Sequence, residues 1–178
     1  MNTPAQTATV TAICASLADG ERLIEQMDRQ FYGTPRPDLG CDRPGAHIRH
    51  HLDHVTLLLD GLQDGLVDYD ARARDTRIET DPDQAIAASA ALRRRLEALD
   101  AAQIDQPLRI CQRTTAGGRD RPTATTSLGR ELLFLHSHAV HHYALLGILL
   151  RAAGVWIEGD MGVMPATLAH RQATAGSA

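Results

Sequence analysis

The sequence contains no lysine, and all 18 of its basic residues are arginines. Schiff-base catalysis and a P-loop phosphate site both need a lysine amine, so both are excluded. Aromatic residues are scarce as well, at 3% of the chain against 43% for hydrophobic residues as a whole. The core must therefore consist mostly of Leu, Ala, Ile and Val, a mixture that favours helices over sheets.

The chain has few cysteines, and none of them form a CxxC pair. Cys14, Cys41 and Cys111 are widely spaced, which argues against a disulfide framework, and we expect a cytoplasmic protein. The first residues lack the features of a signal peptide, and no apolar run approaches the ~18 residues of a membrane span. A formal net charge of −4 argues against nucleic acid as a partner. We therefore expect neither a membrane nor a nucleic acid to be bound.

Apolar residues recur with helical spacing in four segments of the chain. Asp81 and Ser127 are typical helix N-caps, and Pro82 fits the first position of a helix. Residues 107–114 could form a short strand. The pattern predicts an all-α fold, a four-helix bundle with long crossover connections, in a single domain over 1–178. The expected bundle spans about 5–153 with a C-terminal extension over 154–178, and the expected helices run over about 5–31, 44–66, 82–99 and 128–153.

Histidines are concentrated in two short windows of the sequence. Imidazole is a common ligand for divalent transition metals, and both windows lie in predicted helices. The sequence therefore predicts a metal ion held between two helices of a bundle. The windows read HIRHHLDH and HSHAVHH, and together they contain His47, His50, His51, His54, His136, His138, His141 and His142.

The pair His138 and His142 carries the strongest metal signal. The two residues are four positions apart, so they lie one turn apart on one face of a helix. Leu135 and Leu145 flank them on the same stripe, which predicts that the stripe points inward. Buried imidazoles need partners for their nitrogens, and a shared metal supplies one. Spacing alone leaves the ligand from the second helix open among His47, His50, His51 and His54.

Two carboxylates lie close to the predicted ligands in the sequence. Asp53 follows His50 by three residues, and Glu131 lies on the stripe of His138. Either could orient a ligand or accept a proton. A solvated helix carboxylate and a first-turn Glu favoured by the helix dipole are the ordinary alternatives.

These segments resemble the DinB-like superfamily of small bacterial metal-binding helical bundles. Its pattern is an H-x-x-D on the second helix and an HxxxH on the last long helix, matched here by GAHIRHHLDH and HSHAVHHY. The resemblance covers roughly residues 8–153. It implies the ligands His50, His138 and His142, an up-down-down-up bundle and a homodimer.

The resemblance also implies a class of chemistry. Three neutral imidazoles leave a divalent metal with an open position, as in catalytic sites. We expect zinc, with Ni, Fe or Mn as alternatives, and a low-molecular-weight thiol as a second cofactor. The predicted activity is a metal-dependent thiol transferase or hydrolase acting on a small electrophile. The alternatives are a non-catalytic, stress-associated metal-binding dimer and a metal-free pH sensor.

Overall fold

The computed structural model describes residues 4–40, 42–157 and 159–176, and this part of the chain is mostly helical. Its long helices are α1 (Pro4–Glu25), α3 (Pro44–Asp60), α5 (Pro82–Glu97) and α6 (Leu128–Ala152). Shorter helices are α2 (Arg29–Gly33), α4 (Thr76–Thr80) and α7 (Pro165–Ala175), with 3-10 turns η1 (Pro37–Leu39) and η2 (Ala101–Gln103).

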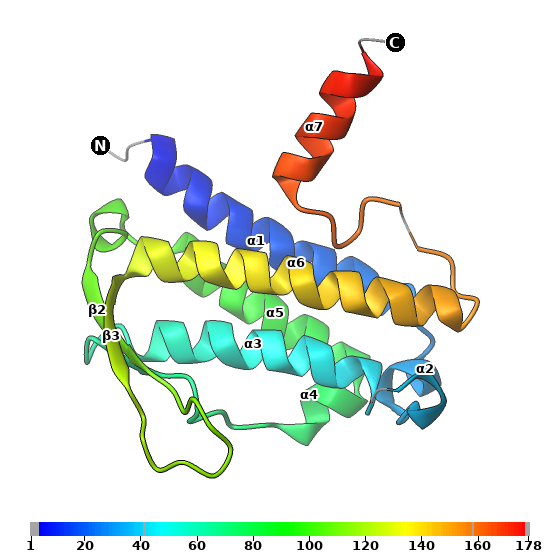
Figure 1. Cartoon of the computed structure of the whole chain (residues 1–178), viewed down its shortest axis with the longest axis horizontal. Coiled ribbons are helices and arrows are strands. Elements are labelled where there is room, and N and C mark those ends of the chain that lie inside the picture. The colour runs from blue at the N-terminus through cyan, green and yellow to red at the C-terminus, as the bar shows by residue number, and fades with distance from the viewer. Residues whose placement is uncertain (1–3, 41, 158, 177–178) are drawn as a thin grey trace.

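The long helices pack around one hydrophobic core. α1 lies against α5 and α6, and α3 lies against the same two helices (Figure 1). Leucine is the commonest residue type in the described core, and Leu17, Leu58 and Leu135 are almost completely buried. The core is therefore of the aliphatic type that the composition predicts. Because α3 and α6 are neighbours, the two histidine windows lie on adjacent helices.

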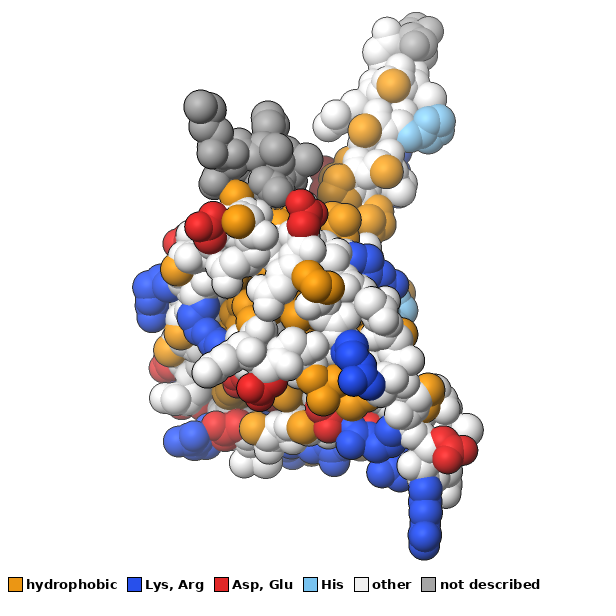
Figure 2. All heavy atoms as spheres, turned by 90° about the vertical axis from the view of Figure 1, so that its left-hand side faces the viewer, with side chains coloured by type: hydrophobic (Ala, Val, Ile, Leu, Met, Phe, Trp, Pro, Cys, Tyr) orange, Lys and Arg blue, Asp and Glu red, His pale blue; other side chains and the backbone are white. Residues whose placement is uncertain are grey.

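A small three-stranded sheet closes one end of the molecule, so the all-α prediction is wrong in this respect. Its strands are β1 (Leu66–Asp68), β2 (Pro107–Cys111) and β3 (Thr123–Ser127), in that order. β1 pairs with β2 in parallel and β3 pairs with β2 antiparallel. Val67 and Leu108 are buried, which anchors the sheet to the helices. Figure 2 views the molecule from this end.

The helix ends differ from the predictions at two places. The first helix stops at Glu25, and the side chain of Asp28 accepts a hydrogen bond from the backbone N–H of Phe31 and caps the separate helix α2. The second helix ends at Asp60, and Leu66 begins β1. In both places apolar residues continue past the end of the helix and still face the core. Met27 and Phe31 after α1 and Val67 after α3 are buried.

Both predicted N-caps are confirmed. The side chain of Asp81 accepts from the backbone N–H of Asp83, and that of Ser127 accepts from Arg130. Residues 107–111 form the expected strand.

By length and mean hydropathy, α6 is the one helix of the described residues that could cross a membrane, a property that core helices share. α7 projects from the body (Figure 1). Cys14 and Cys111 are free thiols, and Cys41 lies outside the described residues.

Candidate metal centre

Three histidines from α3 and α6 converge at the contact between these helices. One ring nitrogen of each of His50, His138 and His142 lies within 4.8 Å of the others. The Nε2 atoms of His138 and His142 are 3.0 Å apart, because one helical turn separates the two residues. The structure thus brings together the three residues that the resemblance implies.

The donor set fits a divalent ion such as zinc. Zinc holds imidazole nitrogens at about 2.0–2.1 Å, so two of its ligands lie about 3–4 Å apart. The observed nitrogens need to move by no more than about 1 Å to meet this condition. Nδ1 of His138 is buried and has no hydrogen-bond partner among the described residues. Three protein ligands also leave at least one position for another molecule.

Burial keeps these imidazoles neutral, which is the form that binds a metal. It lowers the pKa of His50 to about 2, that of His142 to about 3 and that of His138 to about 4. Neighbouring imidazoles contribute to each of these shifts, because a second positive charge in the cluster would be repelled.

The histidines lie at the edge of the core and not at its centre, which corrects the predicted inward stripe. His138 and His142 are half-buried, and Leu145, expected to point inward with them, is 36% exposed. Leu135 on this stripe is buried as predicted, but farther along α6 the core-facing residues are displaced from the stripe and include Ala139 and Tyr143. An edge position leaves room for a small molecule to reach the imidazoles.

The other histidines of α3 have different partners. Nδ1 of His47 lies 3.1 Å from Nδ1 of His142, and His54 donates its Nδ1 proton to the backbone carbonyl of His50 at 2.8 Å. His51 is 1% exposed beside Tyr143, and neither ring nitrogen has a partner within the described part of the chain. These three histidines surround the three-nitrogen group without belonging to it.

Asp53 is held by an arginine. It accepts from Nη1 of Arg49 at 2.8 Å, and Arg49 also donates from Nε to Glu79 at 2.7 Å. The arginine one turn earlier on α3 therefore takes the carboxylate that the H-x-x-D pattern places near His50. Asp53 makes no hydrogen bond to a histidine in the described ranges.

Glu131 is completely buried and accepts three hydrogen bonds. They come from Tyr69, Thr126 and Arg130, at 2.8, 2.8 and 3.0 Å. Glu131 reaches the histidines only indirectly, because the ring of Tyr69 stacks on that of His54 with centroids 5.3 Å apart. Its hydrogen bond with Thr126, near the end of β3, joins α6 to the sheet.

Sequence reasoning missed Arg72 and Phe134. Nη1 of Arg72 lies 2.7 Å from Nδ1 of His50, although the two residues are 22 positions apart. Nothing in the pattern of this polar connection distinguishes Arg72 from its neighbours. The ring of Phe134 stacks on that of His138, with centroids 5.6 Å apart. The spacing FxxxH could have indicated that contact.

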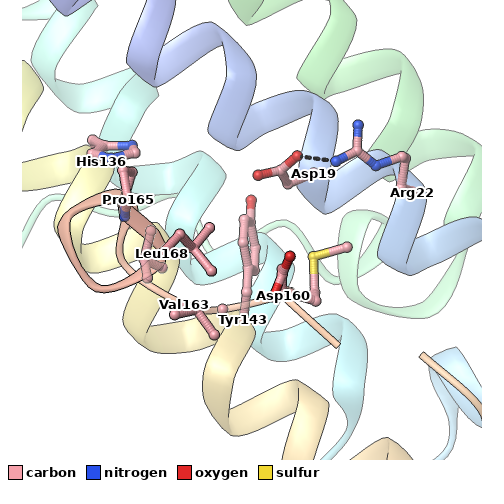
Figure 3. A pocket seen from close by; sticks show the side chains of 11 residues that line it. Asp19, Arg22, His136, Tyr143, Asp160, Val163, Pro165 and Leu168 are labelled. Atoms are coloured by element: carbon pink, nitrogen blue, oxygen red, sulfur yellow. Dashed lines mark hydrogen bonds and ion pairs between the residues drawn. The ribbon is translucent and has the colours of Figure 1, made fainter. Parts of the chain in front are cut away.

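His136 belongs to a different site on the opposite side of α6. Its Nδ1 lies 2.6 Å from Oγ of Ser16, and the residue lines a cavity of about 190 Å³ between α1, α6 and the segment before α7. Figure 3 shows the hydroxyl of Tyr143 pointing toward Asp19 across this cavity. The histidine window of α6 is thus divided between two sides of the helix.

Comparisons with known proteins show a similarity in sequence and a similarity in structure. No model of a known protein family matches the chain. FK506-binding protein 5 of Rhizopus delemar is 28% identical over 105 residues, which are 59% of this chain and 27% of that protein. The chain thus spans about a quarter of the length of this curated relative.

The structural match is broader. The crystal structure of a DinB-like protein, YjoA of Bacillus subtilis, superposes with a TM-score of 0.60 and covers 88% of this chain and 99% of that chain. The sequences are 19% identical, so the match shows the fold. The resemblance suggested by the histidine motifs is confirmed at that level, and the chain has the DinB-like fold.

Proposed function

We propose that this protein binds one divalent metal ion through His50, His138 and His142, with zinc as the first choice and Ni, Fe or Mn as alternatives. The observation that carries the proposal is the convergence of three ring nitrogens from two helices within 4.8 Å. The neutral state of the imidazoles, which is the form that binds a metal, supports it.

We further propose that the centre acts as a metal-dependent thiol transferase or hydrolase on a small electrophile. A bound divalent ion with an open position supplies Lewis acidity to a water or to a low-molecular-weight thiol. The half-buried setting and the ring of Phe134 over His138 reduce the water around such a reactant. Among the described residues, the cluster contains no cysteine.

Metal analysis of protein purified without a histidine tag tests the binding proposal. We expect about one ion per chain in the wild type and a loss of that ion in His138→Ala and His142→Ala. His136→Ala is the matched control, because this histidine lies on the same helix and contacts Ser16 instead. Wild-type metal content in both ligand variants would contradict the assignment.

Turnover of electrophiles with an added thiol tests the catalytic proposal. We expect product formation that needs both metal and His142. Metal binding without turnover of thiol or water would instead support a second candidate, a non-catalytic, stress-associated dimer in which the ion links α3 to α6.

The second candidate is favoured by an apolar surface on α6. Leu133 and Ile148 are 53% and 62% exposed, Phe134 and Leu145 of the same helix are also exposed, and apolar side chains gathered on one surface mark interaction sites. A homodimer would cover them. Light scattering of the wild type against Ile148→Asp tests this, and a monomeric wild type would exclude it.

We also infer that the long helices form a four-helix bundle wired up-down-down-up. The packing of α1 and α3 against both α5 and α6 supports this arrangement. So does the course of the chain in Figure 1, where α1 and α6 begin at the end near the sheet and α3 and α5 begin at the opposite end.

A further inference from the structure

Arg72 is a positively charged residue in direct contact with the candidate metal centre. It lies between β1 and α4, is half-buried, and places Nη1 2.7 Å from Nδ1 of His50. Its Nε is buried without a hydrogen-bond partner, and no carboxylate forms an ion pair with it among the described residues. A half-buried guanidinium without a counter-charge is costly, so its environment favours an added anion.

Two further arginines share a cavity with Arg72. The cavity measures about 650 Å³ and is lined by Arg72, Arg74 and Arg113 together with threonines of the β2–β3 loop. Neither Arg74 nor Arg113 forms an ion pair with a carboxylate in the part of the chain that the structure describes. Most of the other arginines of the described residues do, Arg43 and Arg121 among them. Figure 2 shows basic and acidic side chains mixed at this end of the molecule.

The acidic residue that lines this cavity, Asp70, is already paired with other groups of the protein. Asp70 accepts from the backbone N–H of Arg113 at 2.7 Å and from Nε of Arg121 at 3.2 Å. The three lining guanidinium groups therefore leave the cavity with a net positive charge. Arg74 also has a φ of 52°, a left-handed conformation that non-glycine residues adopt at an energetic cost and that often marks a functional loop.

We propose that this cavity binds an oxyanion, a carboxylate or phosphate group, of the substrate that reacts at the metal centre. The proposal rests on the proposed function, because Arg72 connects the cavity to a predicted metal ligand. Guanidinium forks bind both kinds of oxyanion through paired N–H donors. The substrate class is thus a small electrophile with an anionic group.

The contact between Arg72 and His50 couples the two sites. A guanidinium only donates hydrogen bonds, so Nδ1 of His50 must be the unprotonated acceptor. A neutral His50 that binds a metal either uses Nδ1 for the ion or keeps its proton there. Both states abolish the hydrogen bond and release Arg72 toward the cavity. Metal binding should therefore raise the affinity for an anion, and anion binding should raise the affinity for the metal.

Isothermal titration calorimetry with inorganic phosphate and with succinate tests the proposal on the full chain, with and without zinc. We expect binding of at least one probe that is stronger with zinc and about tenfold or more weaker in Arg72→Gln and in Arg113→Gln. Arg119→Gln is the matched control, because this exposed arginine belongs to the same loop and does not line the cavity. The two probes distinguish a phosphate from a carboxylate site.

The outcomes separate this proposal from the proposed function. Metal content equal to that of the wild type in Arg72→Gln, together with unchanged anion affinity, would overturn the anion site and leave the metal site intact. Failure of both probes to bind zinc-loaded wild type would overturn it as well. If the wild type binds no zinc but binds an anion in a way that depends on Arg72 and Arg113, the metal centre would be overturned and the anion cavity retained.

Discussion

Two polar regions lie on neighbouring faces of α3 and differ in how their groups are paired. In the first, Arg49 joins Asp53 to Glu79, and Arg43 adds a second bond to Glu79 at 2.7 Å. All four side chains are at most 22% exposed, and each charge has a partner of opposite sign, although Nε of Arg43 is buried without a hydrogen-bond partner among the described residues. This region holds α3 to α4 without any ligand.

The second region, the imidazole cluster, is incomplete. Nδ1 of His138 is buried without a partner among the described residues, and the Nε2 atoms of His138 and His142 are only 3.0 Å apart. The difference teaches that polar burial on one helix can serve two purposes. A network whose charges pair with one another contributes to stability by itself, whereas a cluster of neutral nitrogens of one kind indicates a missing ligand.

The largest effect should come from breaking the ion-pair network. Arg49→Met leaves Asp53 without its counter-charge in a buried setting, and we expect the free energy of unfolding to fall by roughly 3 kcal/mol. Urea denaturation measures it, and metal content should not change. Arg95→Met is the control, because its pair with Asp60 is exposed and should be worth less than about 1 kcal/mol. Equal losses in the two variants would contradict the comparison.

Adding the missing ligand should stabilise the imidazole cluster. At free zinc about 100-fold above the dissociation constant, we expect the free energy of unfolding to rise by about 2.7 kcal/mol over chelator-treated protein. His142→Ala should remove this increment, since the ion then loses one of its three ligands. Denaturation with zinc and with chelator measures both, and an undiminished increment in the variant would place the ion elsewhere.

Acid should destabilise the metal-free protein through the buried imidazoles. Burial lowers the pKa of His51 to about 3, against about 6.5 in the unfolded chain. Between these values the unfolded state binds more protons, so the free energy of unfolding falls as the pH drops below about 6.5. His51→Leu should weaken this dependence between pH 7 and pH 5. An unchanged slope would mean that His51 is charged or solvated in the folded protein.

The smallest effect is expected on the other side of α6. His136→Ala removes one hydrogen bond to Ser16, whose hydroxyl still reaches the carbonyl of Ala12, so the loss should be about 1 kcal/mol. Thermal denaturation measures it. A loss of bound metal in this variant would show that the two sides of the helix are not separate.

Local signals made part of the fold predictable. The caps at Asp81 and Ser127 act within three residues of themselves, and both are present. The break after Glu25 was hidden because Met27 and Phe31 continue the apolar stripe into the core. The sheet was mostly missed, since β1 and β2 pair across about 40 residues and such pairing has no local signal.

The site was predictable to a similar extent. The HxxxH pair follows from helix geometry alone. The choice of His50 over its three neighbours depends on how α3 is rotated against α6, which spacing does not determine. Arg72 depends on the path of the connection after β1, and only the folded chain reveals its contact with His50.

The central claim is that one ion is shared by histidines of α3 and α6. Crystals of zinc-loaded protein, measured at the zinc absorption edge, test it most directly. We predict a single anomalous peak about 2.0–2.1 Å from one ring nitrogen of each of His50, His138 and His142. A peak bound by other residues, or none between these helices, would contradict the account.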